Sequence, residues 1–417
     1  MLALVVSVAL LFVQVATSSQ VVASAEPSPL HALSVPPASQ ASSGLSLQFS
    51  GQRAYSYLAA QVALGPRIPG SQARRDCAQY VAGTLEGLGL NVTFHDFDVA
   101  GVPCQNVLAK LNQDPAHRRV VVLGAHYDTR KVADKDPVPE NRDDPVPGAN
   151  DGASGVAVLL ELAKAFADHA SDLSVQVWFT FFDAEDQGGG AIPGFGWCDG
   201  SERFVADLDQ FLDDGLNASS LDAMILLDMV GGTNLEFVWE TRSTPALRQA
   251  IFDVGRLVLG HGSAFPAVPK QLSVIDDHVA FLEAGVPAVD LIVDFTDASP
   301  DGWPHHHRTT DDLSNVDQNS LQVTGETVEA FFQLNYWLKE GESPDDLPGG
   351  TGGDWRGATS SGATVAASPA PFTLAWAAAA SFGLVGACRG ARRRSLPRVN
   401  RRTPRARRPS REWGRSK

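Results

Sequence analysis

The chain has 417 residues, of which 44% are hydrophobic and 19% are charged, and this globular composition excludes a wholly disordered or collagen-like chain. The net charge of −15 is unevenly distributed, because residues 389–417 carry +12 and the rest of the chain carries −27. An acidic body repels polyphosphate, so we expect no nucleic-acid binding by this body, and the Arg-rich tail is considered separately. The four cysteines have neither CxxC spacing nor the density of a disulfide scaffold, and their spacing predicts no metal site.

The amino-terminal segment has the features of an export signal. Residues 2–17 form an apolar run too short to span a membrane comfortably, and residues 23–25 (Ala-Ser-Ala) resemble a signal-peptidase site. We predict that residues 1–25 are a cleaved signal peptide and that the chain is exported, with an uncleaved membrane anchor as the alternative. An oxidising compartment would allow Cys77 and Cys104 to pair, and the sequence leaves this open.

Residues 45–342 have the pattern of a single α/β domain. Near-continuous apolar runs, typical of strands buried on both faces, alternate with amphipathic helical patterns. The expected helices are residues 76–87 and 156–166, and the expected strands are residues 92–99, 120–128, 175–183, 223–230 and 288–295. This alternation predicts a mixed, mostly parallel sheet flanked by helices, with an edge strand at 92–99.

The composition changes after this domain. Residues 343–371 are rich in Gly, Ser, Thr, Ala and Pro, which is typical of a flexible linker. Residues 372–388 are uncharged and, as a helix, reach the short limit of a membrane span, and the Arg-rich residues 389–417 follow at once. The positive-inside rule then predicts a membrane anchor or sorting segment, a cytoplasmic tail and an extracellular body. A DNA-binding tail and a removed processing signal are the alternatives.

Polar residues follow the ends of successive predicted strands. In a parallel sheet these ends meet in one crevice, so the side chains there should lie close together. Several carboxylates in one crevice would repel one another unless a cation lay among them, and His126 and His307 add nitrogen donors. A mixed set of imidazole and carboxylate ligands suits Zn²⁺. The strand-end and helix-start acids are Asp128, Asp151, Asp183, Glu185, Asp186 and Asp228.

Seven short motifs, in this order, resemble the M28 zinc family, which contains co-catalytic zinc aminopeptidases and glutaminyl-peptide cyclotransferases. The motifs are AHYDT at 125–129, GANDGASG at 148–155, FFDAED at 181–186, LLDM at 226–229, DDH at 276–278, GVPA at 285–288, and His307 with Asp311. The resemblance covers roughly residues 54–338 and implies a zinc exopeptidase-like fold.

The resemblance also implies roles for individual residues. In dinuclear members, the position of Asp151 bridges two metals, those of Asp186 and His307 complete one site, and those of His126 and Asp228 complete the other. The cyclotransferases use a single zinc, at the positions of Asp151, Asp186 and His307. Glu185 matches the general base in both groups. Within the triple histidine, His307 fits the family spacing to Asp311, and His306 is the competing ligand.

Some features favour the cyclotransferase. In those enzymes the acid matching Asp276 shares a hydrogen-bond network with the acids matching Glu185 and Asp228, in place of a second metal. Two positions depart from the animal enzymes, which have Glu at position 186 and Trp at position 306. Trp197 and Trp303 are the candidates for an aromatic substrate-binding wall, with plain packing as the alternative, and residues 130–148 are expected to form a loop at the rim of the site.

The sequence therefore predicts an enzyme that acts on peptides or proteins with a free N-terminus. The preferred activity is that of a zinc-dependent glutaminyl-peptide cyclotransferase, which forms N-terminal pyroglutamate and releases ammonia with one Zn²⁺, Glu185, Asp228 and Asp276. The alternative is an M28 aminopeptidase with two metals. A third possibility is a non-catalytic peptide-binding surface domain, because a fold alone does not show activity.

Overall fold

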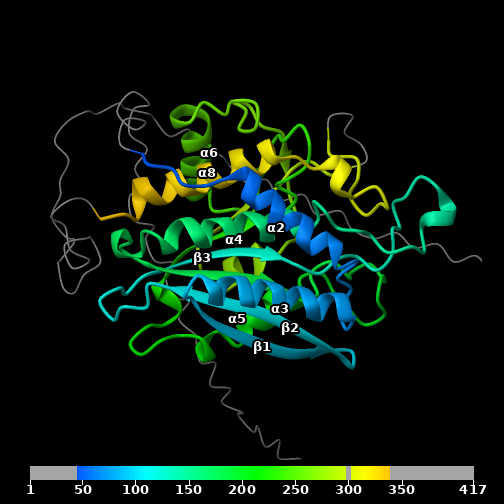
Figure 1. Cartoon of the computed structure of the whole chain (residues 1–417), viewed down its shortest axis with the longest axis horizontal. Coiled ribbons are helices and arrows are strands. Elements are labelled where there is room, and N and C mark those ends of the chain that lie inside the picture. The colour runs from blue at the N-terminus through cyan, green and yellow to red at the C-terminus, as the bar shows by residue number, and fades with distance from the viewer. Residues whose placement is uncertain (1–44, 297–301, 339–417) are drawn as a thin grey trace, which may run out of the picture. The chain divides into compact units, whose positions relative to one another are not determined.

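A six-stranded sheet lies at the centre of the computed structural model, which describes residues 45–296 and 302–338 (Figure 1). The strand order is β1-β2-β4-β3-β5-β8. The pairs β1/β2 and β2/β4 are antiparallel, whereas β4/β3, β3/β5 and β5/β8 are parallel. The predicted mixed, mostly parallel sheet is confirmed. The strands are β1 (Asn91–Val99), β2 (Val102–Leu111), β3 (Val120–His126), β4 (Gln176–Phe182), β5 (Leu221–Leu227) and β8 (Ala288–Leu291).

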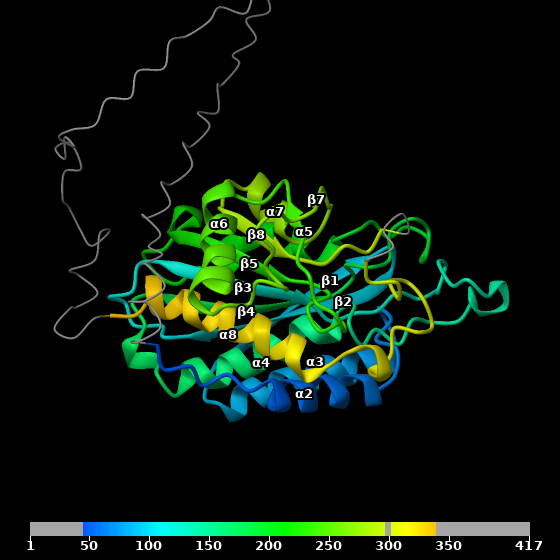
Figure 2. The ribbon, with the colours of Figure 1, turned by 90° about the horizontal axis from the view of Figure 1, so that it is seen from above.

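Helices cover both faces of this sheet (Figure 2). Helices α2, α3, α4 and α8 lie on one face, α5 and α7 lie on the other, and α6 packs beside β8 and α8. Because both faces are covered, every residue of β3 and β4 is buried, which explains their continuous apolar sequences. The helices are α2 (Gly51–Ala63), α3 (Gln72–Gly87), α4 (Ala153–Ala167), α5 (Asp199–Ala206), α6 (Pro245–Asp253), α7 (His278–Glu283) and α8 (Gln318–Asn335).

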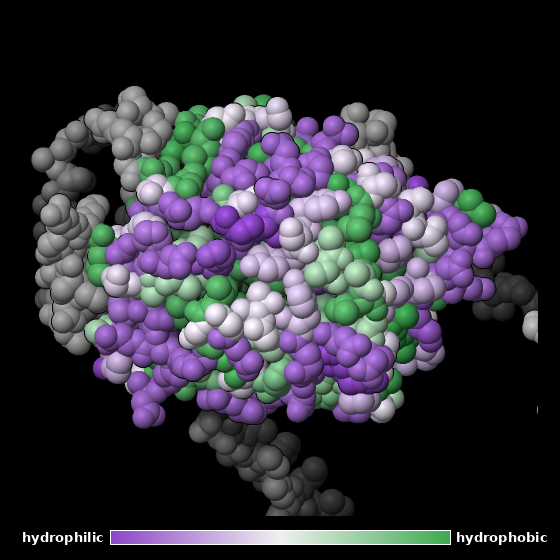
Figure 3. Space-filling view, in the orientation of Figure 1, coloured by the Kyte–Doolittle hydropathy of each residue, from purple (hydrophilic) through white to green (hydrophobic). Residues whose placement is uncertain are grey.

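The helices differ in how much of their surface reaches solvent. Helix α4 is buried almost throughout, because it lies between the sheet and the pair α2 and α8. The outer helices α2 and α3 expose polar residues such as Gln52, Arg53 and Gln79. Hydrophilic residues accordingly cover much of the face shown in Figure 3, interrupted by smaller hydrophobic groups.

Short elements connect these layers. Strands β6 (Trp239–Glu240) and β7 (Gln271–Leu272) form a separate parallel pair. A π-helix, η5 (Val254–Val258), continues α6. Single turns of 3₁₀-helix are η1 (Pro139–Asn141), η2 (Ala170–Asp172), η3 (Leu208–Gln210), η4 (Ala218–Ser220) and η6 (Leu313–Asn315).

The described cysteines, Cys77, Cys104 and Cys198, are all free, so Cys77 and Cys104 do not pair in this structure. Within residues 45–296 and 302–338, no helix has both the length and the apolar character needed to cross a membrane. The predicted signal peptide, linker, anchor and Arg-rich tail lie outside the described residues.

Candidate active site

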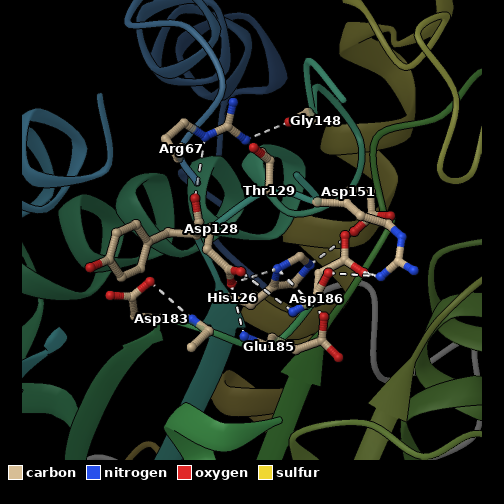
Figure 4. Close-up of polar contacts among 12 residues, drawn as sticks. Arg67, His126, Asp128, Thr129, Gly148, Asp151, Asp183, Glu185 and Asp186 are labelled. Atoms are coloured by element: carbon tan, nitrogen blue, oxygen red, sulfur yellow. Dashed lines mark hydrogen bonds and ion pairs between the residues drawn. The ribbon is translucent and has the colours of Figure 1, made fainter. Parts of the chain in front are cut away.

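The site is built at the carboxyl ends of three neighbouring parallel strands (Figure 4). β3 ends at His126, β4 leads into the segment Asp183–Asp186, and β5 is followed by Asp228. Asp151 directly precedes Gly152, the N-cap of α4. Strands paired in parallel present their ends at one edge of the sheet, and the helix N-terminus beside them favours negative charge.

A first donor group contains Asp151, Asp186 and His307. The Nε2 atom of His307 lies 2.9 Å from Oδ1 of Asp186 and 4.0 Å from Oδ2 of Asp151. All three side chains are buried, and Oδ2 of both Asp151 and Asp186 lacks a hydrogen-bond partner. Buried carboxylate oxygens without partners are costly, so this donor set fits a zinc ion, which two carboxylates and an imidazole can hold.

A second donor group contains His126, Asp151 and Asp228. The Nε2 atom of His126 lies 3.1 Å from Oδ1 of Asp228 and 3.2 Å from Oδ1 of Asp151. Asp151 thus contributes to both groups, as expected of the bridging ligand that the family resemblance implies at this position. The structure brings together all five predicted metal ligands, and their roles stay a prediction.

The structure separates the roles of the two competing histidines. Nδ1 of His306 lies 2.8 Å from Nζ of Lys135, and its Nε2 lies 3.8 Å from Oδ2 of Asp151. An ammonium group only donates hydrogen bonds, so Nδ1 must accept and the proton of the neutral ring sits on Nε2. In this arrangement His306 faces Asp151 with a donor, whereas His307 contacts Asp186 directly. Asp151, His306 and His307 offer ligand atoms that all lie within 4.8 Å of one another, so His306 stays a competing ligand, and the contact with Asp186 favours His307.

Two buried aspartates hold the backbone of the donor residues. Asp128 accepts hydrogen bonds from the amides of Glu185 (3.0 Å) and Asp186 (3.4 Å). Asp311 accepts from the amides of Asn150 (2.7 Å) and Asp151 (3.2 Å). The sequence placed Asp128 among the strand-end acids of the crevice and Asp311 in the last family motif, but it indicated for neither a role in holding the backbone.

Arg67 ties the end of β3 to the loop before Asp151, and this contact also escaped the sequence analysis (Figure 4). Its guanidinium is fully buried and donates to the carbonyl oxygens of Tyr127 (3.2 Å), Pro147 (2.8 Å) and Gly148 (2.6 Å). Gly152 is required in the same region, because a Cβ atom there would lie 2.6 Å from Nε2 of His126. Both features hold the loop against the strand end.

Glu185 lies at the wall of a cavity of about 460 Å³. Its carboxylate is 3.9 Å from Nδ1 of His126. Burial, together with the negative charges of Asp186 and Asp276, raises the pKa of Glu185 well above its usual value. A carboxyl group with a raised pKa can take up and return a proton near neutral pH, as a general base must.

The predicted network acids Asp228 and Asp276 line the same cavity. Burial and the neighbouring charge of Asp276 raise the pKa of Asp228 to about 7. Burial likewise raises the pKa of Asp276 above its usual range. Buried carboxyl groups at such close quarters cannot all be ionised at neutral pH without a compensating charge.

The two predicted wall residues have different positions. Trp197 is 37% exposed, lines the cavity, and stacks on His307 with ring centroids 6.0 Å apart. Trp303 is buried in an apolar cluster with Met229 and Ile292, and it does not belong to the residues that line the cavity. The structure therefore favours the alternative of plain packing for Trp303, because Met229 and Ile292 themselves face the cavity.

The loop of residues 130–148 lies at the rim, as expected. Its residues Arg130, Asp134 and Lys135 line the cavity. Arg130 donates to Asp134 (2.8 Å), and its guanidinium lies 5.0 Å from the ring centre of Trp197. The loop therefore places positive charge beside an otherwise acidic site.

A match to a family sequence profile shows which protein family has this arrangement. The sequence profile described as "Peptidase family M28" matches residues 106–332, more than half of the chain. The chain belongs to peptidase family M28. The matched segment runs from β2 to α8 and contains all five predicted metal ligands.

Relatives of two kinds match this M28 chain. A glutaminyl-peptide cyclotransferase-like protein of Bos taurus is 29% identical over 273 residues, covering 59% of this chain and 66% of that protein. Aminopeptidase YwaD of Bacillus subtilis is 27% identical over 241 residues, covering 54% of this chain and 43% of that protein. The match thus spans less than two thirds of the length of either relative.

Solved structures of M28-like enzymes match over almost their whole length. Glutaminyl cyclase of Porphyromonas gingivalis has a TM-score of 0.61 and 32% identity, covering 68% of this chain and 98% of that chain. A zinc-dependent exopeptidase of Parabacteroides distasonis has a TM-score of 0.61 and 29% identity, covering 69% of this chain and 99% of that chain. These neighbours confirm the zinc exopeptidase-like fold and support a zinc metalloenzyme.

Proposed function

We propose that this M28 enzyme is a glutaminyl-peptide cyclotransferase that converts an N-terminal glutamine to pyroglutamate. One observation carries the proposal: Asp276, from the segment before α7, lines the cavity together with Asp228 and Glu185. The negative charge of Asp276 is among the causes that raise the pKa values of Glu185 and Asp228. Three neighbouring acids with raised pKa values suit a reaction in which protons move between nitrogen atoms.

In this reaction the α-amine of the substrate attacks its own γ-amide carbon. The new carbon–nitrogen bond closes a five-membered lactam, and the bond to the side-chain nitrogen breaks to release ammonia. Glu185 would accept a proton from the α-ammonium group and return it to the leaving nitrogen. A zinc ion held by Asp151, Asp186 and His307 would polarise the γ-carbonyl oxygen as a Lewis acid.

Asp228 and Asp276 would hold the reacting amide. With the pKa of Asp228 raised to about 7, the pair can retain a proton near neutral pH and offer both a donor and an acceptor. The apolar part of the cavity, which includes Val274, Ile292 and Phe295, would hold the aliphatic stem of the glutamine.

The second candidate is an aminopeptidase, and a specific observation favours it. His126, Asp151 and Asp228 offer ligand atoms that all lie within 4.8 Å of one another, so a second metal could be held beside the first. Water would then replace the amine as nucleophile, and Glu185 would accept its proton. The non-catalytic alternative has less support, because Glu185 lies in the cavity next to the donor groups.

The experiment that tests the proposal replaces Asp276 by asparagine. With a Gln-initiated peptide, ammonia release by Asp276→Asn should fall by about 10²-fold or more, while the zinc content stays that of the wild type. The matched control is Asp277→Asn, since Asp277 is equally buried but does not line the cavity. A wild-type enzyme that releases no ammonia, or an Asp276→Asn variant as fast as the wild type, would contradict the proposal.

A further inference from the structure

A cysteine lies against the predicted general base. Cys198 follows Trp197 and is buried, with 3% of its surface exposed. Its Sγ–H donates to Oε1 of Glu185 at 3.5 Å. Neither the cyclisation nor the hydrolysis proposed for this site gives the thiol a role.

The backbone holds this thiol beside Glu185. The amide of Cys198 donates to the carbonyl oxygen of Glu185 (2.9 Å), and the amide of Asp199 donates to that of Ala184 (3.1 Å). Cys198 itself has a left-handed backbone, with φ of +60°. These contacts fix the main chain of Cys198 beside that of Glu185, so that the two side chains start from adjacent positions.

A second carboxylate completes the group. Asp276 is 3% exposed, and its Oδ1 accepts from the amide of Asp277 at 2.6 Å, whereas its Oδ2 is buried without a hydrogen-bond partner. Glu185, Cys198 and Asp276 offer three ligand atoms that all lie within 4.8 Å of one another. Around a tetrahedral zinc, ligand atoms are roughly 3.5 Å apart, so small side-chain movements would close this group on an ion.

We propose that Glu185, Cys198 and Asp276 form a separate, inhibitory zinc site. This site shares no residue with the two donor groups around Asp151. The inference goes beyond the proposed function, because an ion bound here would inhibit cyclisation and hydrolysis in the same way. Glu185 and Asp276 line the cavity and give the ion access, and Cys198 supplies a soft ligand. On binding, the thiol loses its proton to solvent and its sulfur coordinates the ion.

An ion bound at this site would inhibit the reaction by blocking Glu185. A carboxylate that coordinates an ion no longer accepts a substrate proton, so activity falls while the zinc at Asp151, Asp186 and His307 stays in place. The ion would also compensate the buried negative charge of Glu185, Asp276 and the adjacent Asp277.

The first test detects the thiolate directly, with Cd²⁺ as the probe. Titration of Cd²⁺ into the zinc-loaded full chain should produce the ultraviolet charge-transfer absorption of a Cd²⁺–thiolate bond. Cys198→Ala should remove this absorption, whereas the matched control Cys104→Ala, which removes another buried thiol, should keep it. Absorption that is absent from the wild type, or unchanged in Cys198→Ala, would overturn the proposal.

The second test measures inhibition by added Zn²⁺. In Cys198→Ala the zinc concentration for half-inhibition should rise by at least about 10-fold, because even residues that only support metal ligands alter affinity 10- to 100-fold. Equal inhibition of both proteins would overturn the proposal and place the inhibiting ion elsewhere, for example at His126 and Asp228.

Asp276→Asn provides an independent variant on a different element. It should weaken the Cd²⁺–thiolate absorption even if Cys198→Ala fails to fold, and an unchanged absorption would overturn the three-ligand site. The Cd²⁺–thiolate absorption does not depend on which reaction the enzyme performs. A failure of the inhibitory-site proposal is therefore distinguishable from a failure of the proposed function.

Discussion

Strained backbone positions cluster around the candidate site. Ala184, Cys198, Met229 and His307 all have positive φ, between 49° and 60°, although none is a glycine. Ala184 precedes Glu185, Met229 follows Asp228, and His307 is a predicted ligand. Such conformations cost on the order of 1 kcal/mol each and persist where the surrounding structure fixes them, which is typical of functional sites.

The role of Glu185 is tested by changing it to glutamine. Glu185→Gln should keep its fold and its zinc but lower kcat by about 10²–10⁴-fold, because the amide has the same shape and cannot accept the proton. Circular dichroism, zinc content and turnover of the same preparation check this. Turnover close to that of the wild type would remove Glu185 as the base.

The metal ligands are tested by comparing three variants. Asp186→Ala and His307→Ala should each lose zinc, since each removes a ligand from the first donor group. His306→Ala should retain it, because the contact of Lys135 with Nδ1 of His306 leaves the ring proton on the Nε2 atom that faces Asp151. Zinc per chain is the measurement, and zinc loss in His306→Ala alone would reverse the assignment within the triple histidine.

The sequence predicted the residues of the site better than their supports. Strand-end acids and a family motif identify His126, Asp151 and Glu185, because chemistry restricts which residue types occur there. Asp128 and Arg67 act through backbone amides and carbonyls, and the sequence does not show which backbone groups a side chain will reach. The sequence left the place of Trp303 open, because a tryptophan in a loop has the same sequence signal whether it lines a cavity or packs behind one.

At the scale of elements, the buried parallel strands and the antiparallel edge strand β1 were predicted, whereas β2, β6 and β7 were not. β3, β4 and β5 are continuous apolar runs, so their sequences indicate burial on both faces. β2 escaped prediction because it contains Pro103, Gln105 and Lys110 and pairs antiparallel on both sides. Two-residue strands such as β6 carry no periodicity at all, and only tertiary contacts define them.

One buried carboxylate holds the segment that carries Asp276. Glu240, in β6, accepts hydrogen bonds from the amides of Arg242 (3.0 Å), Ser243 (2.6 Å) and Val274 (3.1 Å). Nε2 of His278, in α7, lies 3.3 Å from it. Burial opposes ionisation of Glu240, but the hydrogen bonds from His278 and these backbone amides outweigh it and hold the pKa at about 2.

This network predicts a defined loss of stability in acid. Because the pKa of Glu240 is lower in the folded than in the unfolded state, its contribution is present above the unfolded pKa of about 4.3 and is lost as pH falls toward 2. Glu240→Gln should lower the free energy of unfolding at pH 7 by about 1.5–3 kcal/mol. The difference from the wild type should shrink below pH 4.

Denaturant unfolding at pH 7 and at pH 3 measures this difference. The control is Glu236→Gln, because Glu236 is exposed on the segment just before β6. A Glu240→Gln variant as stable as the wild type at pH 7, or a difference that grows in acid, would contradict the role given to the network.

At the scale of the whole molecule, the two ends of the described domain are joined. The amides of Gln48 and Phe49 donate to the carboxylate of Glu329 in α8, at 2.8 and 2.9 Å. Among the described residues, one core cluster contains side chains from Phe49 near the start to Tyr336 near the end. We propose that this domain is exported and anchored by residues 372–388.

The proposal predicts the result of a truncation. Removal of residues 346–417 should leave the zinc content and kcat within about twofold of the full chain and move the activity from the membrane fraction to the medium, because the domain has its own core. Fractionation of cells that express both forms measures this. A truncated chain that aggregates would show that the tail belongs to the fold, and full-length activity found in the medium would contradict anchoring.

We propose that this M28 enzyme cyclises N-terminal glutamine with one zinc. The most direct measurement offers the purified chain a Gln-initiated peptide and a Leu-initiated anilide at equal concentration, and follows ammonia, free amine and zinc per chain together. We predict ammonia release, little free amine and about one zinc per chain. Release of the free amine with about two metals per chain would contradict the claim and establish the aminopeptidase instead.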